Sequence, residues 1–318
     1  PLNLATWREI RDNEMHWLDN ATPYALFKAL SACHSRAKGQ QNFVYRIRNG
    51  KSWARESPKA NTKVCSINLN LLTAHICKRF SHLRGQKVYL PEGIKYALPT
   101  SEKMFVGNVP TGTRVQGNRL AAGVYWENKW GAHDLDLSGM SVNGAKVGWN
   151  SRYGDNDLLY SGDITNAPNG AVEYLQTQGR LSDTFLVLNN VYSGRTDCEY
   201  KIVVGKGNNV NQQHMMNPNS VLLEQKVQGV QKQTVLGMFV PEEDCECSFV
   251  LLNFGSGNAR VSGKNSSTAI NALLENYQNP LTLEDILVII GVEIADTREA
   301  ADIDLSLDNI NKSTFVEL

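Results

Sequence analysis

Hydrophobic and polar residues alternate along residues 134–138, which read Asp-Leu-Asp-Leu-Ser. Successive side chains of a strand point to opposite faces, so the two leucines are expected on one face and the two aspartates on the other. Alternate residues of a strand lie about 7 Å apart, which lets two short carboxylates lean toward one cation. The pattern therefore predicts a strand with one face in a core and one face that meets a cation or water.

The middle of the chain, residues 87–262, consists of short runs rich in β-branched and aromatic residues, separated by Gly, Asn, Asp and Pro. This composition and spacing favour an all-β sandwich. Residues 205–219 are rich in Asn and are expected to form a long loop. The other predicted strands are 124–126, 146–149, 158–160, 185–188, 200–204, 235–240 and 249–254.

The two ends of the chain follow helical spacing instead. Asn20 followed by Pro23 predicts the cap and first turn of a helix, and a further helix is expected over 69–83. Asn49-Gly50 lies between two short β-like runs and predicts a hairpin. Near the C-terminus, Thr282 predicts a helix start and Gly291 its end, before two short strands and a last helix. The expected fold class is α+β, with a basic helical lobe at 1–86, a β-sandwich at 87–265 and a small α/β element at 266–318.

The composition is that of a globular protein, with 42% hydrophobic and 20% charged residues in 318 positions. No run of about 18 apolar residues and no signal-peptide pattern is visible, so a soluble cytoplasmic protein with no membrane partner is expected. The chain begins at Pro1, which fits either removal of an initiator Met or a fragment of a longer chain. Six irregularly spaced cysteines indicate reduced thiols, and Cys245 and Cys247 lack the further ligands of a zinc site.

Charge is distributed unevenly along the chain although the net charge is zero. Residues 1–120 hold 19 Lys and Arg against 7 Asp and Glu, whereas residues 121–318 hold 13 against 25. A basic N-terminal lobe fits contact with phosphate-rich polymers, or attraction to the acidic remainder of the chain. The candidate nucleic-acid contacts around the predicted hairpin, beside Tyr45 and Trp53, are Arg46, Arg48, Lys51 and Arg55, and those on the following helix are Lys78 and Arg79.

The acidic residues recur in a longer pattern across residues 126–165. The sequence reads Trp126, then His133-Asp134-Leu135-Asp136-Leu137-Ser138, then Val147-Gly148-Trp149-Asn150, then Tyr160-Ser161-Gly162-Asp163-Ile164-Thr165. This order resembles the core of the tellurite-resistance (TerD-like) stress proteins, over about residues 120–204. The resemblance implies a two-sheet β-sandwich that binds calcium through acidic loops. It also implies a role in bacterial or phage stress response, phage defence or tellurium resistance.

The resemblance assigns candidate calcium ligands to particular positions. Asp134 and Asp136 match the family's aspartate pair, Asn150 its strand-end asparagine and Asp163 its G-D-x-T aspartate. Where the family continues with a second acidic cluster, this chain keeps only Glu173, so one of two calcium sites is expected to be weakened or lost. Asp155 and Asp157 lie in an expected loop and could compensate, although they are also ordinary turn residues. His133 is expected at the surface or behind the ligands, because calcium prefers oxygen.

The sequence predicts a non-enzymatic, calcium-binding interaction module whose partners are other proteins of the same stress or defence system. Two alternatives remain open. One is a nucleic-acid-binding protein that uses the basic lobe, and the other is a metal-dependent phosphodiester hydrolase with Asp134, Asp136 and Asp163 as ligands. No phosphate-binding loop, zinc-protease motif or nucleophile elbow is visible. A plainer interpretation is that the carboxylates only line the solvated face of a sandwich.

Overall fold

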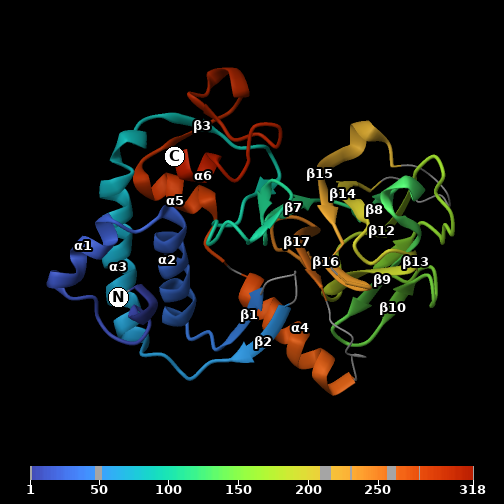
Figure 1. The fold of residues 1–318 in the computed structure, drawn as a ribbon, viewed down its shortest axis with the longest axis horizontal. Coiled ribbons are helices and arrows are strands. Elements are labelled where there is room, and N and C mark those ends of the chain that lie inside the picture. Colours follow the sequence, from blue (N-terminus) through green and yellow to red (C-terminus); the bar gives the residue numbers. More distant parts are fainter. Residues whose placement is uncertain are drawn as a thin grey trace. The chain divides into compact units, whose positions relative to one another are not determined.

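The computed structural model describes residues 2–46, 52–207, 216–229, 231–255, 263–278 and 280–317, with only the backbone described at 45–46, 52–53, 263–269 and 316–317. The chain forms two compact units (Figure 1). The first comprises Pro1–Val44, Ala54–Thr111 and Ala272–Leu318, and the second comprises Tyr45–Trp53 and Gly112–Asn271. The fold is mixed α+β with mostly antiparallel sheets, as the sequence predicts.

The first unit joins the two ends of the chain, a division that differs from the three segments expected from the sequence. Its sheet has the order β18-β3-β19, in which β3 (Lys87–Tyr89) pairs in parallel with β18 (Glu293–Ala295) and β19 (Ile303–Asp304). Val88 at the centre of β3 is completely buried. Both neighbours of β3 come from the C-terminal segment, so this segment completes the sheet and the core of the N-terminal one.

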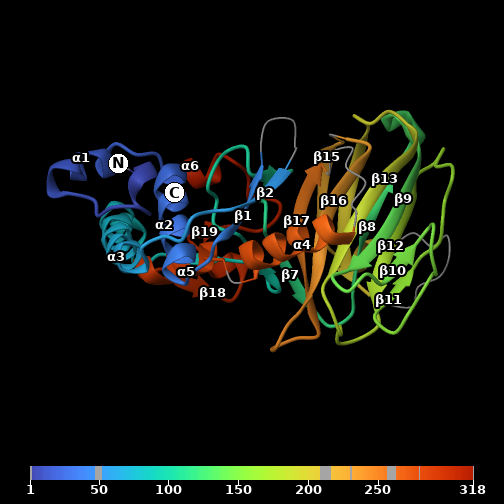
Figure 2. The same ribbon diagram turned by 90° about the horizontal axis from the view of Figure 1, so that it is seen from below.

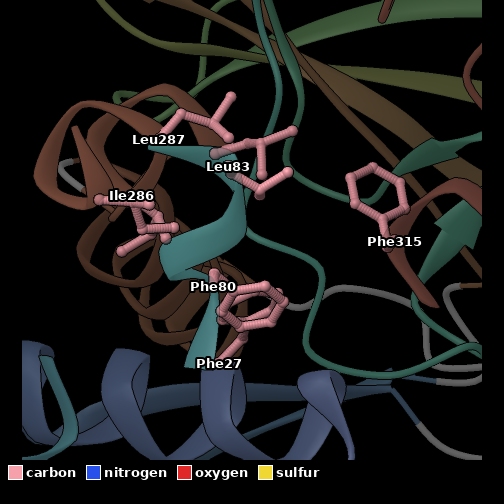
Figure 3. A pocket seen from close by; sticks show the side chains of 8 residues that line it. Phe27, Phe80, Leu83, Ile286, Leu287 and Phe315 are labelled. Carbon is pink, nitrogen blue, oxygen red and sulfur yellow. The ribbon is translucent and has the colours of Figure 1, made fainter. Parts of the chain in front are cut away.

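Helices supply the rest of the first unit. Helix α5 ends at Gly291, whose φ is +96°, and it begins at Thr282 with a capping box formed with Asp285, which confirms both predicted ends. Its buried face meets α2 and the segment after α3 at a small apolar pocket, where Phe27 and Phe80 stack side by side (Figure 3). The helices of this unit are α1 (Met15–Asp19), α2 (Pro23–Ala37), α3 (Thr62–Arg79), α5 (Leu283–Ile290) and α6 (Thr314–Glu317).

Two helix starts differ from the prediction because other side chains cap them. Helix α2 is capped by Thr22, whose hydroxyl accepts a hydrogen bond from the Ala25 amide, and not by Asn20. Helix α3 begins seven residues before the predicted start, at Thr62, where Asn61 accepts hydrogen bonds from two free amides of the first turn. Among the described residues, no helix has the length and apolarity needed to cross a membrane.

The second unit contains two antiparallel sheets (Figure 2). Within this unit, one sheet has the order β10-β9-β13-β16-β17-β7, and the other has the order β11-β12-β8-β14-β15. The first consists of β7 (Arg114–Gly117), β9 (Ala132–Ser141), β10 (Lys146–Gly148), β13 (Phe185–Gly194), β16 (Gln233–Pro241) and β17 (Cys247–Gly255). The second consists of β8 (Leu120–Trp126), β11 (Leu158–Tyr160), β12 (Ala171–Thr177), β14 (Glu199–Lys206) and β15 (Val221–Gln228).

The core of the second unit lies between these sheets. Gly139 of β9 approaches Leu158 and Leu175 of the opposite sheet so closely that a Cβ atom there would lie 2.8 Å from Leu158. Leu135 and Leu137, on the same face of β9, are completely buried. The leucines of the alternating pattern therefore face the opposite sheet, as the sequence predicts.

Several elements lie outside the sequence prediction. Strand β12 is buried at every position, so its seven residues, Ala-Val-Glu-Tyr-Leu-Gln-Thr, show no alternation to recognise. Strand β15 and helix α4 (Gly263–Tyr277) were also not expected. In the N-terminal region, β1 (Asn42–Arg46) pairs with β2 (Ser52–Glu56), and the residues between them lie outside the described part of the chain. The remaining short strands are β4 (Ile94–Lys95), β5 (Phe105–Val106) and β6 (Val109–Pro110).

Candidate metal centre

The aspartates of the alternating pattern lie on β9, at a place where this strand has a partner on one side. Asp136 is in register with Asn190 of β13, and Asp134 is in register with Ser193 across a bulge. On the other side, β10 pairs with β9 only from Ser138 onward. Beyond that point the Leu137 carbonyl accepts from the Trp149 amide at 3.2 Å, and the Leu137 amide donates to the Glu173 carboxylate at 3.0 Å. Loops and side chains thus replace a strand along this edge.

Asp163 reaches the same place from the connection between β11 and β12. Gly162 adopts a φ of +107°, which a residue with a Cβ rarely takes, and so permits the turn after Ser161. The start of this connection is held on β12, because the Ser161 amide donates to the Tyr174 carbonyl at 2.9 Å and the Ser161 hydroxyl accepts from the Tyr174 amide. The sequence places Asp163 27 residues after Asp136, and the hairpin of β11 and β12 returns it to β9.

Asp134, Asp136 and Asp163 form the acidic cluster. One carboxylate oxygen from each lies within 4.8 Å of the other two. Asp134 is 5% exposed and Asp136 2% exposed, whereas Asp163 is exposed. Of the two environments expected for this face, a cation or water, the solvated one is wrong for the two aspartates of β9, because both are buried. Aspartates are almost never buried without a partner, so the burial itself demands an explanation.

Few donors reach the acidic cluster. The Asn190 amide donates to Asp136 at 3.4 Å, and one buried oxygen of Asp134 has no hydrogen-bond partner within the described part of the chain. None of the ion pairs found among the described residues involves any of the three aspartates. An unpaired buried acceptor costs about 1–3 kcal/mol, and more when it is charged. The acidic cluster is thus short of positive charge and of donors.

The pKa values of the two buried aspartates reflect this shortage. Burial, together with the charge of Asp163, raises the pKa of Asp134 from 3.8 to about 6. Burial and the charge of Asp134 raise the pKa of Asp136 to about 7, although the hydrogen bond from Asn190 acts in the opposite direction. Both shifts favour the protonated form, because desolvation and like charges disfavour a carboxylate. A bound cation would favour the charged form of both carboxylates and would therefore lower both pKa values.

Glu173 occupies a different position from the one predicted. It lies on β12 with 0% exposure and is outside the acidic cluster. Its carboxylate accepts three hydrogen bonds, from the Leu137 amide, the Ile164 amide and the Tyr160 hydroxyl. Burial raises the pKa of Glu173 to about 8, while the three donors act to lower it. The oxygens predicted to bind a metal are thus already engaged by protein donors.

The other predicted ligands are also engaged elsewhere or lie apart. Asp155 accepts hydrogen bonds from the amides of Asp157 and Leu158, both at 2.9 Å, and pairs with Arg152 at 3.2 Å. Asp157 accepts from the amide and hydroxyl of Ser182. Both aspartates therefore act as turn residues, the alternative that the sequence left open. Asn150 is an exposed residue of the turn after β10, and His133 is exposed, as expected.

The predicted nucleic-acid contacts are only partly described. Arg48 and Lys51 lie outside the described residues, as does the side chain of Arg46. Arg55 and Lys78 are exposed. Arg79 donates to the carbonyls of Leu18 and Ala21, so its guanidinium holds the end of α1.

The acidic cluster has the chemistry of a site for a hard cation. Its donors are all carboxylate oxygens, which calcium and magnesium prefer. Two ligands on opposite sides of a calcium ion, each at about 2.3–2.6 Å, are separated by about 4.6–5.2 Å. Because the three oxygens lie within 4.8 Å of one another, a single ion can contact all of them. The cluster can therefore bind a divalent metal ion.

No protein-family model, curated protein or solved structure matches this chain.

Proposed function

We propose that this protein is a calcium-binding, non-enzymatic interaction module of the TerD-like type, which serves a bacterial or phage stress or defence system. The observation that supports this most directly is the acidic cluster, in which the buried Asp134 has an oxygen that no donor of the described residues reaches. Such an oxygen is satisfied when a cation binds. The two antiparallel sheets and the order of the acidic motifs are also what the resemblance implies.

Calcium is the ion we propose because of the ligand set. Three carboxylates supply hard oxygen donors and no nitrogen or sulfur, which disfavours zinc and other softer metals. Calcium accepts six to eight oxygens in flexible geometry, whereas magnesium requires a near-ideal octahedron at about 2.0–2.1 Å. The flexible coordination of calcium suits three carboxylates of which one, Asp163, is exposed, with the remaining positions filled by water or by a partner.

The ion would act on the loop that bears Asp163. Without metal, the charges of the three aspartates repel one another, which together with burial raises the pKa values of Asp134 and Asp136. With metal, Asp163 would be held against β9, and the connection from residue 161 to residue 170 would become a more rigid surface. We propose that other proteins of the same system recognise this surface.

Calorimetric titration of the full chain tests the proposal. Calcium should bind with a stoichiometry near one, and magnesium more weakly. In the Asp134→Asn, Asp136→Asn variant the calcium affinity should fall at least about 100-fold, because two of three charged ligands are lost. The matched control is Asp155→Asn, Asp157→Asn, which removes two carboxylates of the same spacing and should change the affinity by less than about threefold.

Two results would overturn the proposal. The first is that the wild-type chain neither binds calcium in the calorimeter nor gains thermal stability at millimolar calcium. The second is that the Asp134→Asn, Asp136→Asn variant retains the wild-type affinity.

A further inference from the structure

Glu173 connects two segments that are far apart in the sequence. Its Oε2 accepts hydrogen bonds from the Leu137 amide at 3.0 Å and from the Tyr160 hydroxyl at 2.5 Å. Its Oε1 accepts from the Ile164 amide at 2.8 Å. The side chain projects from β12 in one sheet, and it reaches the edge of β9 in the other.

The two amides have a common relation to the acidic cluster. The Leu137 nitrogen belongs to the peptide group that follows Asp136, and the Ile164 nitrogen belongs to the peptide group that follows Asp163. Each bond therefore fixes the backbone immediately next to an aspartate of the cluster. One carboxylate holds both backbones at once, and they come from different elements.

We propose that Glu173 is a positioning residue of the metal centre, which holds Asp163 against Asp136 without contacting the ion. This inference rests on the proposed function, because it assumes that the acidic cluster binds calcium. Groups that orient ligands typically change metal affinity by about 10- to 100-fold when they are removed.

A carboxylate is the group that this position requires. Two amides approach from different segments, and each needs an acceptor. Glutamine offers one acceptor oxygen, and its NH2 group would face one of the two N–H donors. Aspartate keeps two acceptors, but its side chain is one methylene shorter. Glu173→Gln should therefore release one of the two peptide groups, while Glu173→Asp weakens the contact to one or both.

A purely structural role for Glu173 makes a different prediction. In that case any acid of this unit that accepts several hydrogen bonds should behave alike on removal. The half-buried Glu242 provides the comparison, because its Oε1 accepts from Arg114 and from the Ser248 hydroxyl. Glu242→Gln should lower the thermal stability, as Glu173→Gln does, but should leave the calcium affinity within about twofold of wild type.

The first test uses the metal-free, full-length wild-type chain and follows hydrogen exchange of individual amides. The Leu137 and Ile164 amides should both be protected, although Ile164 lies outside the strands. In Glu173→Gln the exchange of at least one of these amides should increase about tenfold or more. An Ile164 amide that exchanges in the wild type as fast as a free loop would overturn the inference, and this result does not depend on how any variant folds.

The second test measures calcium affinity by calorimetry. Glu173→Gln should bind calcium about 10- to 100-fold more weakly than wild type. The calcium affinity of Glu173→Asp should lie between those of wild type and Glu173→Gln. Tyr160→Phe keeps the hydrogen bonds from the Leu137 and Ile164 amides, so its calcium affinity should stay within about threefold of wild type. Equal affinities of wild type and Glu173→Gln would overturn the positioning role. Absence of calcium binding by the wild type would instead overturn the proposed function, so the two failures are distinguishable.

Discussion

Two pairs of aspartates in the second unit have the same spacing and opposite environments. Asp134 and Asp136 are separated by one residue, as are Asp155 and Asp157. Asp155 and Asp157 accept short hydrogen bonds from nearby backbone amides and from Ser182. Asp134 and Asp136 are buried, have one donor between them among the bonds described above, and lie beside a third aspartate.

The difference shows that donors, and not the acidic residues themselves, decide which pair is available to a metal. A carboxylate that already accepts backbone hydrogen bonds is stabilised as an anion and gains less from a cation. A buried carboxylate without donors is destabilised as an anion and gains the most. Substitutions and pH changes that affect one pair and leave the other unchanged therefore test whether hydrogen-bond donors explain this difference.

The largest expected effect is that of pH on calcium affinity. The raised pKa values of Asp134 and Asp136, about 6 and about 7, mean that calcium must displace protons from both at low pH. The affinity should fall on the order of 100- to 1,000-fold from pH 8 to pH 5. Calorimetry in buffers of different ionisation enthalpy measures both the affinity and the protons released. An affinity that is constant over this range would mean that the two carboxylates are not the ligands.

The metal-free protein should become more stable when one buried charge is removed. The pKa of Asp136 in the folded state exceeds its ordinary value of 3.8, so the folded state binds more protons than the unfolded state between about pH 4 and pH 7. Stability contributed by this group is therefore lost as pH rises through that window. At pH 8, Asp136→Asn should raise the free energy of unfolding by about 1–3 kcal/mol, as measured by urea denaturation with a chelator present. A loss of stability at pH 8 would show that other groups stabilise the Asp136 anion in the folded protein.

The exposed member of the cluster should matter less than the buried members. Asp163→Asn should weaken calcium binding about tenfold, because the ion loses one charged ligand that water can partly replace. Asp157→Asn, an exchange of the same kind in the other aspartate pair, should change the affinity by less than twofold. Titration of Asp163→Asn and Asp157→Asn under identical conditions compares their calcium affinities. An equal loss of affinity in the two variants would show that Asp163 is not in contact with the ion.

The smallest effect on calcium binding is expected at the other pair. Asp155→Ala removes the acceptor of two backbone amides and the partner of Arg152, so the free energy of unfolding should fall by about 1–2 kcal/mol. Asp155→Asn retains an acceptor oxygen, so its free energy of unfolding should fall by less than that of Asp155→Ala. Urea denaturation provides the measurement, with calcium affinity unchanged in both variants. A reduced calcium affinity would place Asp155 in the metal centre after all.

Local sequence signals predicted the elements that depend on neighbours along the chain. The helix bounded by Thr282 and Gly291 was predicted at both ends, because a capping box and a left-handed glycine act within a few residues. The strand that bears Asp134 and Asp136 was predicted from its alternation. Strand β12 was not, because a strand that is buried on both faces has no polar face to produce alternation.

Three features of the candidate site could not be predicted because they depend on long-range contacts. The donor from Asn190 follows from the pairing of β13 with β9, and the sequence contains no signal for that register. The hydrogen bonds of Glu173 depend on the approach of two sheets, and the sequence, in which the resemblance made Glu173 a candidate calcium ligand, contains no signal for them. The engagement of Asp157 by Ser182 joins residues 25 positions apart.

The place of β9 in the chain and the face that it turns to the core follow from residue types and from the period of a strand, so they can be predicted from the sequence. The burial of the other face, the return of Asp163 to it and the exclusion of Glu173 from the cluster follow from the packing of distant segments. The physical reason is that the charge and hydrogen bonding of a carboxylate depend on the atoms around it, and in this unit those atoms come from strands far apart in the chain.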